Sequence, residues 1–215
     1  IKVTKPRKAL VYYKPSGYPH ASIPTINKCL DIMGKKTGAF TADFSAKAED
    51  FNAENLKNYD LLIFNNTTKI QKAFKTAEQR QALLDYIKNG GGFVAIHAAT
   101  DAGYPEWPEY VQLIGGVFDG HPWGSKGTYG ISVDDPKHAC CDHLDTTFKL
   151  SDELYKYKEY DRKNQRVLIS IDTRVSPKNG RKDEDHAMVW VKQYGKGRVF
   201  VSSFGHNEHL CWDKG

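Results

Sequence analysis

The stretch that most constrains the fold is FVAIHAAT, residues 93–100, which follows three glycines at positions 90–92. Residues 93–96 form a short apolar run rich in β-formers, which predicts a buried strand. His97 follows directly, with small alanine residues on both sides of it. A strand, one polar residue, small residues and a new helix make the pattern of a nucleophile elbow, in which a reactive side chain stands on a tight turn. The sequence therefore predicts an α/β fold with His97 at the tip of such a turn.

The residue at the tip of this turn narrows the chemistry. Hydrolases with such an elbow carry Ser there and amidotransferases carry Cys, whereas this chain carries His97. A nucleophilic thiol would have to come from elsewhere, and Cys140 and Cys141 lie in no comparable context. The four cysteines show no CxxC spacing, so neither a disulfide framework nor a zinc finger is predicted. A histidine at the tip can act as an acid or base, or it can bind a metal.

Length and composition limit the class of protein. The chain has 215 residues, of which 40% are hydrophobic and 27% charged, so we expect one globular domain over residues 1–215. The net charge of +5 is modest and the lysines are scattered, so nucleic-acid binding is not expected. No apolar run reaches the roughly 18–20 residues that a membrane span needs. The chain begins at Ile1, which fits a removed signal peptide as well as trimming, so a periplasmic, secreted or cytoplasmic location stays open.

Strand and helix patterns alternate in the first half of the chain and give way to strands in the second half. Ser22 could cap a helix that ends at Gly34, and Thr76 with Gln79 fits the capping box of another helix. The predicted strands are residues 9–13, 38–42, 60–64 and 93–96, then 128–133, 147–150, 155–160, 167–171, 187–193 and 198–203. This order predicts a mostly parallel sheet with an added antiparallel, strand-rich portion.

Polar residues follow several of these strands at the point where each one ends. They are His20 after the first strand, Asn65 and Asn66 after DLLIF, His97 after FVAI, and His206 after VFVSSF. Because ligands bind outside the carboxyl ends of the strands in open α/β sheets, these side chains are predicted to converge on one edge. His121, in FDGHP, could reach the same cleft from its loop.

A structural interpretation competes with the functional one at each position. A histidine at a strand end often only caps backbone groups, and for His20 or His121 alone we prefer that interpretation. His97 and His206 together favour a functional site, since both follow strongly apolar strands.

Three carboxylates lie near these candidate histidines in the predicted fold. Asp152 and Glu153, in SDELY, precede a strand and offer a general base, with a solvated turn as the equal alternative. Asp101, just after the predicted elbow, could cap a helix or orient His97.

The motifs together resemble the ThuA-like (trehalose utilisation) family, and their order covers nearly the whole chain. The resemblance implies a flavodoxin-like, three-layer fold of the class I glutamine amidotransferase type without the cysteine nucleophile. It also implies a link to disaccharide and glycoside metabolism, often beside dehydrogenases that make 3-keto sugars. Members usually continue into a further helix after the GHN motif, so that helix is expected beyond residue 215. The matching stretches are GYPHASIP (17–24), YDLLIFNNTT (59–68), GGGFVAIHAATD (90–101), GGVFDGHP (115–122), DELY (152–155) and VWVKQYGKGRVFVSSFGHN (189–207).

These observations favour a carbohydrate-active enzyme that transfers protons on a disaccharide, a glycoside or a 3-keto derivative of one. The predicted catalytic residues are His97, His206 and Glu153. A divalent metal, zinc or manganese, is predicted on His97, His121 and His206, and no nucleotide cofactor is expected. A homo-oligomer is compatible with the sequence. The alternatives are a non-catalytic sugar-binding or regulatory module and a metal-dependent amidohydrolase. The predicted substrate contacts are His20, Asn65, Asn66, Asp101, His121 and Tyr155.

Overall fold

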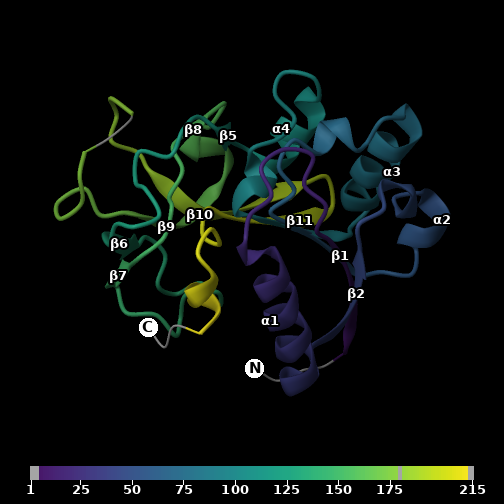
Figure 1. The fold of residues 1–215 in the computed structure, drawn as a ribbon, viewed down its shortest axis with the longest axis horizontal. Coiled ribbons are helices and arrows are strands. Elements are labelled where there is room, and N and C mark those ends of the chain that lie inside the picture. The colour runs from purple at the N-terminus through teal and green to yellow at the C-terminus, as the bar shows by residue number, and fades with distance from the viewer. Residues whose placement is uncertain (1–4, 179–180, 213–215) are drawn as a thin grey trace.

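The computed structural model describes residues 5–178 and 181–212 of the chain. Within these residues one nine-stranded sheet crosses the molecule, and the strands of its first part are parallel (Figure 1). Parallel neighbours end at the same edge of a sheet, so the residues that follow these strands come together. From the outer edge inward, the parallel strands are β2 (Phe40–Ser45), β1 (Arg7–Tyr12), β3 (Leu61–Asn65), β4 (Gly92–Ile96) and β11 (Gly197–Ser202).

The antiparallel strands continue the same sheet beyond β11. They are β10 (Ala187–Tyr194), β9 (Arg166–Ile171), β6 (Tyr129–Val133) and β7 (Thr147–Leu150). The predicted strand-rich portion is thereby confirmed, and it extends the central sheet sideways. The prediction for residues 155–160 was too long, because only Tyr157–Lys158 form a strand, β8, which pairs with β5 (Val117–Phe118) in a separate small sheet. Glu159 has a φ of 51°, and this left-handed backbone ends the extended segment.

Helices cover both faces of the sheet, which gives the α/β three-layer architecture predicted (Figure 1). α1 (Ser22–Thr37) lies on one face, while α2 (Ala53–Leu56), α3 (Ala77–Lys88) and α4 (Pro108–Ile114) lie on the other. Alternate residues of β1 therefore enter different cores. Ala9 and Val11 pack with Leu30 of α1, whereas Leu10 and Tyr12 join the larger core that contains Leu83 of α3. The 3₁₀ turns are η1 (Ala48–Asp50), η2 (Ile70–Lys72), η3 (His97–Thr100), η4 (Arg162–Asn164) and η5 (Glu208–Cys211).

Helix α1 differs from its prediction at both ends. Ser22 does not cap the helix, because its hydroxyl donates to the Gly205 carbonyl oxygen at 2.7 Å. Gly34 does not end the helix, which continues to Thr37 and stops where Gly38 takes a left-handed φ of 64°. Gly34 is instead a point of close packing, since a Cβ there would lie 2.5 Å from the Phe40 carbonyl oxygen. Glycine at this position therefore allows close contact between α1 and β2.

Helix α3 begins as the sequence predicts. The Thr76 side chain accepts a hydrogen bond from the Gln79 backbone, and the Gln79 side chain accepts one from the Thr76 backbone. The capping box is thereby confirmed, and it orients the helix so that Leu83, Leu84 and Ile87 are buried against the sheet.

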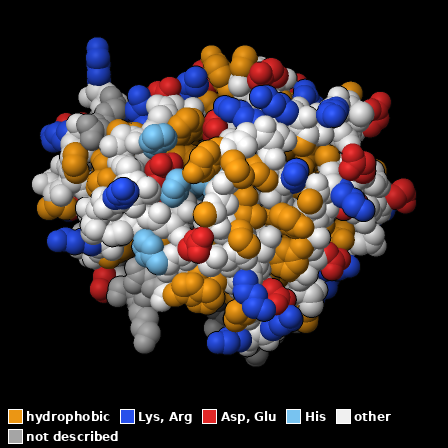
Figure 2. All heavy atoms as spheres, in the orientation of Figure 1, with side chains coloured by type: hydrophobic (Ala, Val, Ile, Leu, Met, Phe, Trp, Pro, Cys, Tyr) orange, Lys and Arg blue, Asp and Glu red, His pale blue; other side chains and the backbone are white. Residues whose placement is uncertain are grey.

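Charged side chains are distributed over the surface in small groups. Figure 2 shows Lys and Arg interspersed with Asp, Glu and apolar side chains on the face that it presents, as expected from the scattered lysines of the sequence. Within the described ranges, none of the helices combines the length and the apolar character needed to cross a bilayer.

Candidate metal and catalytic site

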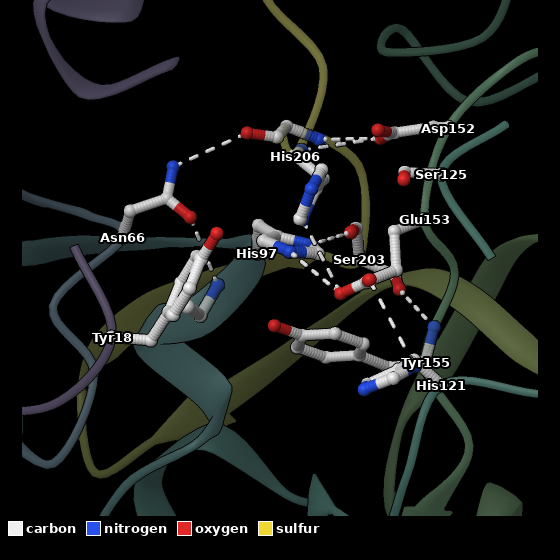
Figure 3. A network of polar contacts seen from close by, with 12 residues as sticks. Tyr18, Asn66, His97, His121, Ser125, Asp152, Glu153, Tyr155, Ser203 and His206 are labelled. Atoms are coloured by element: carbon white, nitrogen blue, oxygen red, sulfur yellow. Dashed lines mark hydrogen bonds and ion pairs between the residues drawn. The ribbon is translucent and has the colours of Figure 1, made fainter. Parts of the chain in front are cut away.

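The candidate site lies at the edge of the sheet where the parallel strands end (Figure 3). His97 follows β4 directly, and His206 follows β11 in the GHN turn. His20 stands in the loop between β1 and α1, and Glu153 comes from the segment between β7 and β8. Segments that are far apart in sequence thus bring four polar side chains to one place.

His97 occupies the tight turn that the sequence predicts. Its φ is 47°, in the left-handed region that few non-glycine residues adopt. Ala98 and Ala99 are fully buried beside it, so larger side chains would not fit there. The segment that follows is the single 3₁₀ turn η3 and not a full helix. A strained residue of this kind points to a function that holds it in place.

The His97 ring is fixed in one tautomer. Its Nδ1 lies 2.6 Å from the Ser203 carbonyl oxygen, which only accepts, so Nδ1 carries the hydrogen. Nε2 is then the basic nitrogen, and it faces Glu153 at 3.9 Å from Oε1. The ring is completely buried and packs against Tyr155 with centroids 4.2 Å apart. Metal-binding and catalytic histidines are commonly oriented in this way, by a hydrogen bond from the ring nitrogen that does not bind the metal or the substrate.

Glu153 stands among the histidines (Figure 3). Its Oε1 lies 3.3 Å from His206 Nδ1, and its Oε2 lies 3.8 Å from His121 Nδ1. The Glu153 side chain is 14% exposed, whereas that of His121 is 56% exposed. Glu153 is therefore an inner carboxylate, and His121 lies between it and the solvent.

Four of these residues form a set suited to a divalent cation. Ligand atoms of His20, His97, Glu153 and His206 all lie within 4.8 Å of one another. Three buried nitrogens in this group, His20 Nδ1, His97 Nε2 and His206 Nδ1, have no well-aligned hydrogen-bond partner, although His206 Nδ1 keeps its 3.3 Å ion-pair contact with Glu153. Buried polar atoms without a partner are rare in proteins, so these three nitrogens point to a further ligand. Imidazole and carboxylate are the donors that zinc and manganese take, and the residues fit such an ion.

The group found in the structure differs from the predicted metal set in one position. His97 and His206 belong to the group, but His20 takes the place that the sequence assigned to His121. His121 is mostly exposed, and its Nδ1 lies 3.8 Å from Glu153 Oε2. His20 is 6% exposed and belongs to the buried part of the group.

The charges in the site follow from burial and from the Glu153 contact. Burial lowers the pKa of His97 well below its usual range, and nearby His20 adds to this effect. Burial, followed by the charge of His206, lowers the pKa of His20 to about 4. The Glu153 contact raises the pKa of His206. Burial alone would raise the pKa of Glu153, but His206 and the other imidazoles lower it. At neutral pH, His20 and His97 are therefore neutral and offer lone pairs beside a carboxylate.

Asp152 points away from the cluster, in contrast to Glu153. It is fully buried, and its carboxylate accepts backbone N–H groups from Gly205 and Asn207 at 2.8 Å each and from His206 at 3.4 Å. The general base proposed for this acidic pair is thus Glu153 alone. Asp152 holds the GHN turn and so positions His206.

The two asparagines after β3 connect the segments behind the site. Asn65 donates to the Ile23 carbonyl of α1 at 3.0 Å, and Asn66 donates to the Gly205 carbonyl at 3.3 Å. The Asn66 side-chain oxygen accepts from the Ala98 backbone at 3.4 Å. The Asn66 amide contacts the elbow and the GHN turn from inside, whereas the Asn65 amide contacts α1. Both amides have internal partners, and their predicted contacts with a substrate stay a prediction.

Asp101 and Tyr155 differ in their relation to the cluster. Asp101 pairs with Lys69 at 2.6 Å, so it does not orient His97. Tyr155 is buried under the His97 ring and forms the floor of the site.

Sequence reasoning missed two groups of the site. Tyr18 is 64% exposed, and its ring meets His20 edge-on at 4.8 Å. An aromatic residue two positions before a candidate histidine was the available signal. Ser203 acts through its backbone carbonyl on His97, and a backbone acceptor carries no signal in the sequence.

The fold and the site together define a class. The chain is an α/β protein with a glutamine amidotransferase-like fold in which a histidine, and not a cysteine, occupies the elbow. The chain belongs to the ThuA family, described as trehalose utilisation, whose family model matches residues 8–214. No curated protein matches the chain.

Solved structures agree with this assignment at the level of the fold. A ThuA-like protein from Bacteroides uniformis ATCC 8492 is 24% identical, with a TM-score of 0.81 over 100% of this chain and 88% of that chain. A ThuA-like protein from Parabacteroides merdae ATCC 43184 is 20% identical, with a TM-score of 0.69 over 94% of this chain and 80% of that chain. The β-galactosidase of Bacillus circulans sp. alkalophilus is 11% identical, with a TM-score of 0.61 over 95% of this chain and 29% of that chain. The same fold thus forms a minor part of that much longer chain.

Proposed function

We propose that this chain is a metal-assisted enzyme that moves protons on a disaccharide, a glycoside or a 3-keto derivative of one. The observation that carries the proposal is the set of three buried nitrogens on His20, His97 and His206 that lack a well-aligned hydrogen bond and lie together with Glu153. The trehalose utilisation description of the family supports a sugar as substrate.

Three histidines and one carboxylate divide naturally into two roles. Catalytic metal sites commonly use three protein ligands and keep one position open. We assign His20, His97 and His206 as the ligands, since each has a buried nitrogen without a well-aligned hydrogen bond and their ligand atoms lie within 4.8 Å of one another. A metal bound there would polarise a substrate carbonyl as a Lewis acid. Glu153 is then the acid–base group beside the metal ligands.

The proton transfer follows from the position of Glu153. A ketone acidifies the C–H bond on the neighbouring carbon, and a positioned carboxylate can accept that proton. Return of the proton to a different atom isomerises the sugar, whereas transfer to a departing glycosidic oxygen completes an elimination. His121, exposed and 3.8 Å from Glu153 Oε2, lies where it can exchange the proton with solvent.

Tyr18 offers a surface for the sugar ring. Its ring is exposed at the mouth of the cluster, beside His20. The loop that carries it is anchored, because Thr68 donates to the Tyr18 carbonyl at 3.1 Å and a Cβ on Gly17 would lie 2.8 Å from the Thr68 side chain. A fixed, exposed aromatic ring suits the apolar face of a hexose.

The test measures metal binding and turnover on the same protein. EDTA-treated protein is titrated with Zn²⁺ and Mn²⁺ by calorimetry, and NMR then follows trehalose and 3-keto-trehalose with and without the metal. We expect one bound ion per chain and new resonances from the keto sugar only with metal. His143→Asn, at an exposed histidine outside the cluster, is the matched control.

Other outcomes separate the alternatives. Line broadening of the sugar without new resonances would indicate the non-catalytic binding module. Release of ammonia from amide substrates by the metal-loaded protein would indicate the amidohydrolase. Absence of metal binding would overturn the assignment of the three ligands.

A further inference from the structure

Two cysteines outside the site lie close together although they are 182 residues apart. Cys29 belongs to α1 and Cys211 ends η5. The Cys29 sulfur lies 3.8 Å from the Cys211 backbone carbonyl oxygen, so the two residues are direct neighbours. Both are free thiols in the structure, and each is partly exposed.

The surroundings of the pair give a small oxidant access. Both cysteines line an open cavity of about 660 Å³ between α1 and β11, with apolar residues such as Ile96 and Phe200 around it. Disulfides need thiols on neighbouring backbones with access to an oxidant, and both conditions are met here. Cys140 and Cys141 provide the contrast, since Cys140 is exposed and Cys141 is 1% exposed.

We propose that Cys29 and Cys211 form a disulfide that joins α1 to η5. At the site end, α1 already contacts the segment that leads into η5, because Ser22 donates to the Gly205 carbonyl oxygen at 2.7 Å. Ile26 continues this contact, because a Cβ on Gly205 would lie 3.4 Å from its side chain. The disulfide would add a covalent link further along the same interface. It would join the helix that follows His20 to the turn that follows His206.

The reaction requires an oxidant of the low-molecular-weight disulfide class, such as oxidised glutathione. The Cys29 thiolate attacks one sulfur of that disulfide, forms a mixed disulfide and releases one glutathione thiolate. The Cys211 thiolate then attacks the Cys29 sulfur, forms the protein disulfide and releases the second glutathione thiolate. The two protein thiols lose two electrons, the glutathione disulfide gains them, and the two thiol protons pass to the released glutathione.

The order of attack follows from the environment of the Cys211 thiol. Burial raises the pKa of Cys211 to about 12, and the neighbouring Cys29 contributes to this shift. Cys211 is therefore a poor first nucleophile, and Cys29 reacts first. The second attack is intramolecular, because Cys29 and Cys211 lie side by side.

The proposal does not depend on the reaction proposed for the site, and it is tested on the intact chain. Protein is incubated with oxidised glutathione, alkylated with iodoacetamide and analysed by intact mass and tryptic mapping without reduction. We expect two alkylation sites to be lost and the peptide of residues 29–35 to appear linked to the peptide that begins at residue 199. The melting temperature should rise by roughly 5–15 °C on oxidation, because the link closes a long loop.

Variants separate this bond from other oxidation products. Cys140→Ser should keep the linked peptide and the rise in melting temperature, while Cys29→Ser and Cys211→Ser should each abolish both. Persistence of both thiols, stable glutathione adducts on them, or a link through Cys140 or Cys141 would overturn the proposal.

Discussion

The backbone at His97 allows a substitution that separates the imidazole from the turn that carries it. Asn tolerates a left-handed φ such as the 47° found here, so His97→Asn should keep the elbow while removing the ligand nitrogen. We expect metal affinity to fall by at least about 100-fold. Loss of a residue that only hydrogen-bonds to a metal ligand lowers metal affinity by about 10- to 100-fold, and loss of the ligand itself should cost more. Calorimetric titration with Zn²⁺ measures this, with His143→Asn as control. Unchanged affinity would show that His97 is not a ligand.

Tyr18 tests the proposed sugar surface at the mouth of the cluster. Tyr18→Ala should raise KM for the keto sugar by about 3- to 10-fold with little change in kcat, because stacking is lost and the cluster is intact. Tyr18→Phe should remain near wild type, since it keeps the ring. Tyr104→Ala removes another exposed tyrosine, which packs on Lys158, and serves as the control. Equal effects of Tyr18→Ala and Tyr104→Ala would contradict a specific role for Tyr18.

At the scale of elements, the GHN turn after β11 depends on one buried carboxylate. Asp152→Asn should leave at least one of the three backbone N–H groups without its acceptor, because an amide nitrogen cannot accept. We expect the free energy of unfolding to fall by about 1–3 kcal/mol and metal binding to weaken as His206 shifts. Urea titrations measure the first effect, with exposed Asp145→Asn as control. An unfolding curve of Asp152→Asn that matches wild type would show that the GHN turn does not depend on the Asp152 carboxylate.

Much of the site could be predicted because strand ends determine it. His20, His97 and His206 each follow an apolar strand, and parallel strands bring such residues to one edge. The elbow was equally predictable, since small neighbours around one polar residue leave few other conformations. Ser22 and Gly34 were misread as helix boundaries because each makes a tertiary contact, with Gly205 and Phe40, that no local pattern reveals.

The remaining differences between prediction and structure concern which way a side chain points. Asp152 and Glu153 are adjacent, and neighbouring residues of an extended segment face opposite sides, so only one can reach the cluster. The sequence gives no sign of which one it is. His20 and His121 both lie in loops, and only tertiary packing buries the first and leaves the second 56% exposed. The direction in which a side chain points thus depends on tertiary packing, whereas the order of the strands in the sheet determines which segments lie close together.

At the scale of the whole molecule, the site exists only when the complete sheet is assembled. Its residues come from the ends of β1, β4 and β11 and from the segment before β8. No single segment holds two of the three histidine ligands proposed. Folding and formation of the site are therefore coupled. The burial of the histidines should contribute to the free energy of unfolding of the whole chain.

This coupling makes the stability of the EDTA-treated protein depend on pH. The folded pKa of His20 and His97 lies below that of an unfolded histidine, about 6.5, so the unfolded chain binds more protons as the pH falls below that value. Stability should therefore fall from pH 6 to pH 5, by about 1 kcal/mol for each buried histidine. His206 has a raised pKa, so it stabilises the folded chain in its protonated form. This contribution is nearly complete between pH 5 and pH 6 and is lost only as the pH rises above that range.

Urea titrations at pH 6 and pH 5 measure this loss of stability. The variant His20→Gln isolates the part of the loss that comes from His20. Because glutamine does not titrate, the variant should lose about 1 kcal/mol less than wild type between the two pH values. His143→Gln, at an exposed position, should lose as much as wild type. Equal losses in His20→Gln and wild type would mean that His20 is protonated in the folded chain at pH 5. Its nitrogen would then not be the neutral donor that the proposed metal site requires.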